Sequence, residues 1–136
     1  MTILLPIFAM AGLTFFCVFR LGFLRFSAIR RGEIDGRYFR LYKDYEEPEY
    51  LRVNSRHVIN LYEAPILFYA ISIIAYVTET VSTLILALAW TYVALRYAHS
   101  YIHLTSNRVV HRFRIFATSQ LLLMILWLVV LLGLLI

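Results

Sequence analysis

The sequence predicts an all-α integral membrane protein that folds as a four-helix, up-and-down bundle. Composition is the first indication, because 62% of the 136 residues are hydrophobic and only 15% are charged, far from the balance of a soluble globular domain. Length is the second. Four apolar stretches reach the roughly 20 residues that a spanning helix needs, and they lie at about residues 3–26, 58–77, 83–103 and 115–136. These stretches lack the strict alternation of barrel strands, so helices are the spanning elements.

The connections arrange these helices as antiparallel neighbours in a single domain, residues 1–136. The links VTETVST and LTSNRVV stand before and after the third stretch, and links this short force the helices that they join into antiparallel pairs. The longest connection, at about residues 27–57, is polar and rich in tyrosine, which is typical of a solvated loop. We expect the first stretch to be an uncleaved span rather than a signal peptide, since no basic residue precedes it and no small-residue cleavage site follows.

The basic residues predict the orientation of the chain. All 13 Lys and Arg residues lie between Arg20 and Arg56 or between Arg96 and Arg114, in and around the two connections on one side of the membrane. The positive-inside rule therefore places these connections in the cytoplasm and both termini outside. This distribution also argues against a nucleic-acid partner for the net charge of +5. Cys17 is the only cysteine, so neither an internal disulfide nor a cysteine metal site is expected.

Polar residues enter all four predicted helices at a similar depth. Counting inward from the cytoplasmic ends at about 1.5 Å per residue places this layer roughly 6 to 10 Å deep, and its members are Arg20, Glu63, Arg96, His99 and Gln120. An ionised side chain at the centre of a span costs about 2.5 to 3.5 kcal/mol, so Glu63 and Arg96 are expected to face the bundle interior or a wet cavity. We predict that Glu63 pairs with Arg96 or Arg20.

Helical spacing groups the polar residues into two stripes. Arg56, Asn60 and Glu63 stand at i, i+4 and i+7 and share one face of the second helix. Pro65 follows them and loosens the helix locally, because proline lacks a backbone N–H and displaces a carbonyl. The third helix carries a comparable stripe, which consists of Arg96, His99 and His103.

Two interpretations of this layer compete. Buried ion pairs can simply register helices, and Arg residues near a helix end can extend to the headgroups; that second interpretation is favoured for Arg25, Arg30, Arg31, Arg108 and Arg114. For His57, His111 and Gln120 the sequence does not favour a binding role over a structural one. For the two stripes a ligand site is favoured, since intramembrane ionisable groups are functional by default. Excess arginine around one carboxylate suits a small hydrophilic anion that also carries an ammonium group, beside a lipophilic co-substrate.

These motifs resemble the MAPEG family, the membrane-associated proteins of eicosanoid and glutathione metabolism. The resemblance covers essentially the whole chain, and the second-helix motif is its most specific part. The motifs that carry it are Arg56-x3-Asn60-x2-Glu63 with Pro65 close behind, Arg96-x2-His99, and Arg112 after a short loop. The chain is similar to bacterial-type members related to microsomal glutathione transferases, which implies an inner-membrane location.

The resemblance implies a homotrimer that binds glutathione between neighbouring subunits near the cytoplasmic face. It implies a glutathione-dependent transferase, with peroxidase activity as a variant, which acts on lipophilic electrophiles or lipids. Arg112 matches the arginine beside the glutathione sulfur and would stabilise the thiolate. The positions implied for binding of glutathione are Arg20 or Arg25 on the first helix, together with Arg56, Asn60, Glu63, Arg96, His99 and His103.

Three positions depart from the pattern of the synthases in this family. Ile59 stands where they often have Arg, His103 replaces an aromatic hydroxyl, and Phe113 replaces a Ser. These departures argue against eicosanoid synthesis. The alternatives are a non-catalytic lipid- or ligand-binding member and a scaffold whose polar layer only holds the trimer together. A transporter is disfavoured because the chain has no repeated halves.

Overall fold

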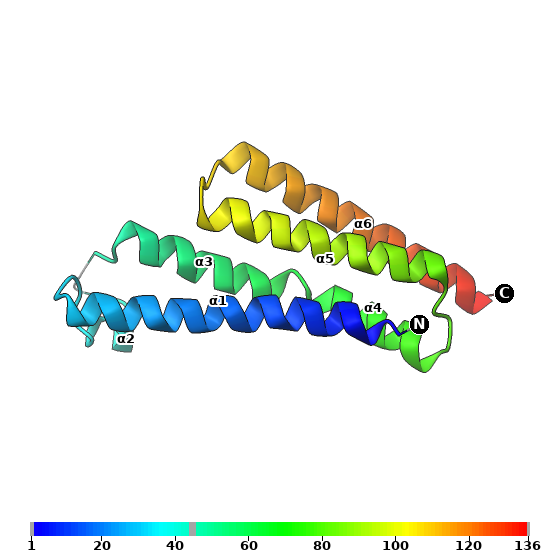
Figure 1. Cartoon of the computed structure of the whole chain (residues 1–136), viewed down its shortest axis with the longest axis horizontal. Helices are drawn as coiled ribbons and strands as arrows, with labels where there is room; N and C mark the ends of the chain where they lie inside the picture. Colours follow the sequence, from blue (N-terminus) through cyan, green and yellow to red (C-terminus); the bar gives the residue numbers. More distant parts are fainter. Residues whose placement is uncertain (1, 44–45, 136) are drawn as a thin grey trace.

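The computed structural model describes residues 2–43 and 46–135, and within them it contains α-helices and no strand. The helices are α1 (Leu4–Arg30), α2 (Tyr38–Leu41), α3 (Glu49–Glu63), α4 (Ile66–Val77), α5 (Thr83–Leu104) and α6 (Val109–Leu135). The long helices lie side by side with similar axes, and the two ends of the chain lie at the same end of the bundle (Figure 1). The predicted all-α, up-and-down architecture is therefore confirmed.

The helices are those of an integral membrane protein. Three segments are long and apolar enough to cross a membrane: α1, the α3–α4 segment Glu49–Val77, and α6. The remaining long helix, α5, has 22 residues, which at a rise of about 1.5 Å per residue is sufficient length for a span. Its apolar character is diluted by polar residues on the face that packs inward, namely Arg96, His99, Ser100 and His103.

The connection after α1 is shorter than the loop expected at residues 27–57. Helix α1 continues to Arg30 and α3 begins at Glu49, because both helix ends bury apolar residues against the segment between them. Leu51 of α3 packs with Ala28 of α1 and with Ile34 and Tyr38. Figure 1 shows these ends projecting past the α5–α6 turn, with α2 beside them.

The second predicted span is broken at Pro65. Helix α3 ends at Glu63 and α4 begins at Ile66, because proline has no N–H to donate to the carbonyl of Leu61. The hydroxyl of Tyr92 on α5 donates to the neighbouring carbonyl of Ala64 at 3.5 Å. A buried hydrogen bond of this kind supports the irregular backbone at membrane depth, and the predicted loosening of the helix at Pro65 is confirmed.

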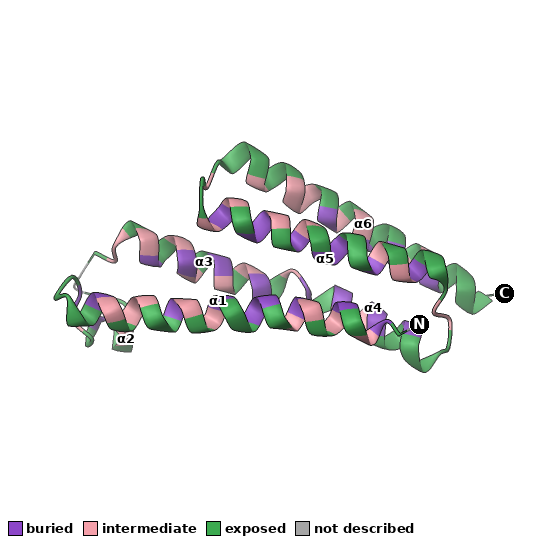
Figure 2. Ribbon diagram, viewed as in Figure 1, coloured by how far each residue is buried: buried purple, intermediate pink, exposed green. Residues whose placement is uncertain are grey.

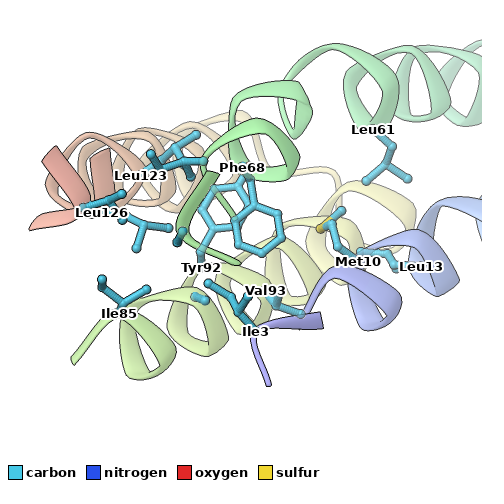
Figure 3. Packing of buried hydrophobic residues seen from close by; sticks show 14 of the residues in the cluster. Ile3, Met10, Leu13, Leu61, Phe68, Ile85, Tyr92, Val93, Leu123 and Leu126 are labelled. Carbon is cyan, nitrogen blue, oxygen red and sulfur yellow. The ribbon is translucent and has the colours of Figure 1, made fainter. Parts of the chain in front are cut away.

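An apolar core fills the half of the bundle nearest the chain termini. It joins all four long helices, and the rings of Phe68 and Tyr92 stack at its centre with 4.6 Å between centroids (Figure 3). Buried positions form inward stripes on each helix, whereas the outer faces are exposed apolar surface (Figure 2). The inward stripe of α5 changes from apolar to polar at Arg96, so the polar layer lies in the other half of the bundle, toward the α5–α6 turn.

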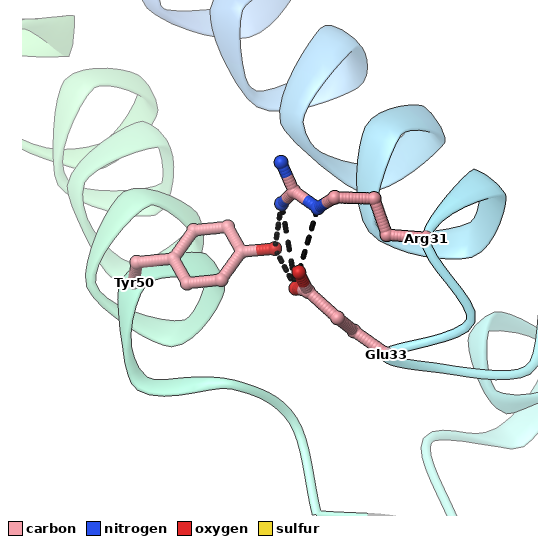
Figure 4. Close-up of polar contacts among 3 residues, drawn as sticks. All are labelled: Arg31, Glu33 and Tyr50. Atoms are coloured by element: carbon pink, nitrogen blue, oxygen red, sulfur yellow. Dashed lines mark hydrogen bonds and ion pairs between the residues drawn. The ribbon is translucent and has the colours of Figure 1, made fainter.

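A polar cluster joins the end of α1 to the start of α3 (Figure 4). Arg31 Nε donates to Glu33 Oε1 at 2.6 Å, and Arg31 Nη2 donates to the Tyr50 hydroxyl at 2.9 Å. The same hydroxyl donates to Glu33 Oε2 at 2.5 Å. The hydrogen bond from Tyr50, together with the Arg31 guanidinium, lowers the pKa of the Glu33 carboxyl below its ordinary value.

Replacing Tyr50 with phenylalanine is expected to raise the pKa of Glu33 toward its ordinary value. Since the lowered pKa favours the ionised carboxyl, the stabilisation is present above the ordinary pKa and is lost as the pH falls through the lowered value. The Y50F variant should therefore unfold at a slightly lower temperature than the wild type at neutral pH and at the same temperature in acid. Thermal unfolding in detergent at both pH values measures this, and an equal difference at both would contradict it.

Candidate functional site

A cavity of about 270 Å³ opens between α3, α5 and α6 in the polar half of the bundle. Its polar lining comes from all three helices, and its edge is formed by exposed apolar side chains of α6. The lining residues are Arg56, Asn60, His99, His103, Val109, Arg112, Phe113 and Phe116. Five of the residues predicted for the site, from two stripes and the start of the last helix, therefore share one cavity.

Arg96 contacts two residues that line this cavity, Asn60 and Phe116. Its side chain is 0% exposed, Nη2 donates a short hydrogen bond to Asn60 Oδ1, and the guanidinium lies 5.7 Å from the ring centroid of Phe116. The other two guanidinium nitrogens, Nε and Nη1, are buried without a partner among the described residues. An unsatisfied buried donor costs about 1 to 3 kcal/mol, and more when it is charged, so Arg96 retains capacity for an anionic ligand.

Helix α3 presents Asn60 to Arg96 one turn before the break at Pro65. Two contacts between α3–α4 and α5 follow one another at a spacing of one helical turn: Tyr92 to Ala64, and Arg96 to Asn60. The first holds the broken end of the helix against α5, and the second lies one turn further toward the α5–α6 turn. The contact of Asn60 and the contact at the backbone break thus lie on successive turns of the same pair of helices.

Arg112 is held at the start of α6 by groups of the α5–α6 turn. Its Nη1 donates to Asn107 Oδ1 at 2.6 Å and lies 3.4 Å from His103 Nε2. His99 Nδ1 lies 3.2 Å from the backbone carbonyl of Arg112 and donates to it. Because two histidines of α5 contact the same residue of α6, the guanidinium has a defined place at the cavity wall.

Arg20 and Arg25 are not brought into this cavity. Arg20 Nη1 donates to Asn54 Oδ1, and Arg25 Nη2 donates to Ser55 Oγ at 3.1 Å, so both arginines join α1 to α3. Arg20 lines a second cavity of about 580 Å³, which lies between α1, α3 and the α5–α6 turn. His103 lines both cavities and therefore lies between them.

The predicted pairing of Glu63 with Arg96 or Arg20 is wrong for the single chain. Glu63 is exposed, Arg96 contacts Asn60, and Arg20 contacts Asn54. The ion pairs within residues 2–43 and 46–135 join close neighbours at the end of the bundle, Arg31 with Glu33 and Arg37 with Asp35. The reason is that the inward face of α3 is a different one, formed by Leu51, Asn54, His57 and Leu61. Gln120 also lies elsewhere, in an apolar hollow with Leu67 and Trp127.

The contacts of four residues in and around the site were not predicted from the sequence. Asn54, Ser55 and Asn107 each accept a hydrogen bond from an arginine, and His57 is completely buried beside His103. The i, i+3, i+7, i+10 spacing of Leu51, Asn54, Val58 and Leu61 was the signal that could have revealed the buried face of α3. The hydrogen bond between Asn107 and Arg112 could not be predicted from the sequence, because it depends on the conformation of the α5–α6 turn.

The electrostatics of the cavity favour an anion. Arg56 and Arg112 line it, and Arg96 contacts Asn60 of its wall, whereas no carboxylate is among the lining residues. Arginine forks bind carboxylates in two-point contacts. Phe113 and Val109 are 66% and 65% exposed at the rim, so apolar surface adjoins the arginines of the cavity. Among residues 2–43 and 46–135, no group of three or more His, Cys, Asp or Glu residues is arranged to hold a metal ion.

Comparison with known families identifies the family of this chain. The model of the MAPEG family matches residues 3–132. The chain belongs to the MAPEG family. In the comparisons with curated proteins and with solved structures, nothing matched the chain. The membership accounts for the spanning helices, and it associates this MAPEG protein with membrane-bound glutathione and eicosanoid metabolism.

Proposed function

We propose that this MAPEG protein is a membrane-bound transferase that joins glutathione to lipophilic electrophiles. The observation that carries the proposal is a cavity lined by Arg56, Asn60 and Arg112, in which Asn60 also contacts the buried guanidinium of Arg96. Glutathione is a small peptide with two carboxylates, an ammonium group and a thiol. Arg56 and Arg96 would hold carboxylates through charge-assisted hydrogen bonds, and Asn60 would bind the peptide backbone.

Arg112 would act on the thiol in this proposal. A guanidinium next to a thiol favours the thiolate, which is the nucleophilic form. The thiolate would attack an electrophile that enters past Phe113 and Val109 at the lipid-facing rim. The new bond forms between sulfur and the electrophilic carbon, and the leaving group departs with the bonding electrons.

A homotrimer is part of the same proposal. Arg56 and Glu63 of the α3 stripe are exposed in the single chain, and an exposed carboxylate at membrane depth requires a protein neighbour or water. The cavity of about 270 Å³ is also at the lower limit of ligand pockets, about 300 to 1,000 Å³. A neighbouring subunit that packs on α3 would cover Glu63 and enlarge the cavity, and Glu63 would then bind the ammonium group of glutathione.

The test is to purify the protein in detergent and to measure thermal stabilisation by millimolar glutathione and conjugation of glutathione to a generic aryl halide. Both are expected for the wild type and for the control variant R114A, whose arginine is exposed on α6 outside the cavity. Stabilisation without turnover would favour the ligand-binding alternative. Neither stabilisation nor turnover would end the transferase proposal. If the variant E63Q dissociated the oligomer while glutathione had no effect on the wild type, the scaffold alternative would be favoured.

A further inference from the structure

Three histidines form a buried cluster at the cavity wall, which His99 and His103 line and His57 adjoins. The ring of His57 on α3 lies 4.7 Å from that of His103 and 5.9 Å from that of His99, centroid to centroid, and the two rings of α5 lie 5.7 Å apart. All three side chains are buried, and His57 is 0% exposed. Both nitrogens of His57, Nε2 of His99 and Nδ1 of His103 have no hydrogen-bond partner among the described residues.

The contacts to Arg112 determine which ring nitrogens carry protons. A guanidinium only donates, so His103 Nε2 accepts from Arg112 Nη1 and the proton of this neutral ring is on Nδ1. A carbonyl only accepts, so His99 Nδ1 carries the proton that it donates to Arg112 O, and His99 Nε2 is a free acceptor. The unpartnered groups are therefore a donor on His103 and an acceptor on His99.

His57 complements both of these groups. A neutral imidazole has one donor and one acceptor nitrogen, and both nitrogens of His57 are free. Its acceptor matches the N–H of His103, and its donor matches the free nitrogen of His99, each through a bridging water, since these nitrogens make no direct hydrogen bond to one another. The three rings thus have the polarity of one continuous hydrogen-bonded chain, which begins at His103 Nε2 on the cavity wall and ends at His99.

We propose that His103 accepts the proton of the bound thiol and that His57 passes the proton on to His99. The S–H bond breaks with its electron pair left on sulfur, an N–H bond forms at His103 Nε2, and Arg112 turns its donor from this nitrogen to the thiolate. The proton on His103 Nδ1 then moves to His57, and the opposite proton of His57 moves to Nε2 of His99. His103 is the catalytic base, and His57 and His99 are positioning residues that relay the proton. The proposal rests on the proposed glutathione transferase activity.

The charged groups around the cluster make the relay depend on the bound anion. Guanidinium groups face it from every long helix that packs on it: Arg20 from α1, Arg56 from α3, Arg96 from α5 and Arg112 from α6. Glu49 is the single carboxylate among the described residues that line the two cavities, and it lines the second one. The four guanidinium groups favour neutral rings for His57, His99 and His103. A carboxylate-bearing thiol supplies the negative charge that offsets a proton on the chain.

The proton balance gives a measurement that a purely structural role of the histidines would not affect. When the thiolate forms, the proton stays on the protein, and it leaves only when product forms, since R–SH and Ar–X give R–S–Ar, X⁻ and H⁺. In rapid mixing with glutathione alone, the ultraviolet absorbance of the thiolate should therefore rise with much less than one proton released to a pH-indicator dye. Proton release should accompany product formation after the aryl halide is added.

Three variants distinguish a proton relay from a purely structural role of the histidines. The variant H57Q keeps a side chain that can donate and accept hydrogen bonds but cannot carry a proton, and H103Q removes the base. We expect H103Q to slow thiolate formation about 10²-fold or more, and H57Q to slow it about tenfold, the loss of roughly one pKa unit of driving force in general-base catalysis. In both, each thiolate that forms should release close to one proton. The control is H111Q, because His111 is exposed on α6 away from the cluster.

The outcomes distinguish this proposal from the one on which it rests. If glutathione neither stabilised the wild type nor was turned over, both proposals would fall. If the wild type conjugated glutathione but released one proton per thiolate, or if H57Q and H103Q behaved as H111Q does, the relay alone would be overturned. If H57Q failed to fold, H103Q would still decide, because its side chain lies at the cavity wall where the thiol binds.

Discussion

Replacing Arg112 with alanine is expected to lower kcat/KM for conjugation about 10²- to 10³-fold, the loss that follows removal of one preorganised donor to a developing anion. The guanidinium is held in place by Asn107 and lies beside His103 at the cavity wall, so it needs little reorganisation when the thiolate forms. Binding should weaken less, since Arg56 and Arg96 still face the carboxylates. Steady-state kinetics together with glutathione-dependent thermal shifts separate the two effects.

The control for the R112A variant must remove its structural contact without its charge. Asn107 has a φ of 46°, in the left-handed region that glycine adopts easily, and its side chain accepts from Arg112. The N107G variant therefore keeps the turn conformation and the guanidinium but loses the contact between them. We expect N107G to retain most of the activity. Equal losses in N107G and R112A would show that Arg112 acts by holding the turn and would contradict its role at the sulfur.

Replacing Arg96 with methionine is expected to stabilise the ligand-free protein and to abolish the thermal shift caused by glutathione. The guanidinium is fully buried, and two of its nitrogens lack a partner among the described residues. Exchange of buried ionic groups for apolar residues of similar volume is often neutral or stabilising by about 1 to 4 kcal/mol. The same exchange removes the donors that would bind a carboxylate. Thermal unfolding with and without glutathione measures both effects.

The R96M variant leaves Asn60 Oδ1 without its donor. A second substitution, at Asn60, removes this unpaired acceptor. The double variant R96M/N60L removes both partners, so it should be at least as stable as R96M alone, because an unpaired buried acceptor costs more than a missing hydrogen bond. A wild type more stable than both variants would mean that Arg96 is primarily structural. That result would favour the scaffold alternative.

Sequence patterns predicted the bundle and much of the polar layer because both follow from local rules. Membrane-length apolar stretches and short links determine an antiparallel bundle, and Pro65 breaks a helix wherever it stands in one. On α5 the polar stripe continues the apolar inward stripe, so its orientation could be inferred directly. Arg96, His99 and His103 are all buried, as their spacing implied.

Helix α3 shows where such reasoning reaches its limit. Periodicity shows that Arg56 and Glu63 share a face, but it does not show which face packs inward when both carry polar groups. Depth alone suggested an ion pair between Glu63 and an arginine, whereas the interior selected the face with Asn54 and His57. Contacts between helices depend on rotation about the helix axis, which packing of the whole bundle determines.

The break at Pro65 affects how the α3–α4 segment is oriented in a bilayer. A continuous helix would transmit any tilt along its whole length, so a thicker or thinner membrane would move every residue on it. Here the exposed apolar surface of α4 lies beyond a backbone joint that Tyr92 holds at Ala64. The break lets α4 take a different direction from α3, so that its apolar outer face and its core residues Phe68, Ile71 and Ala75 are placed independently of the Asn60 contact with α5.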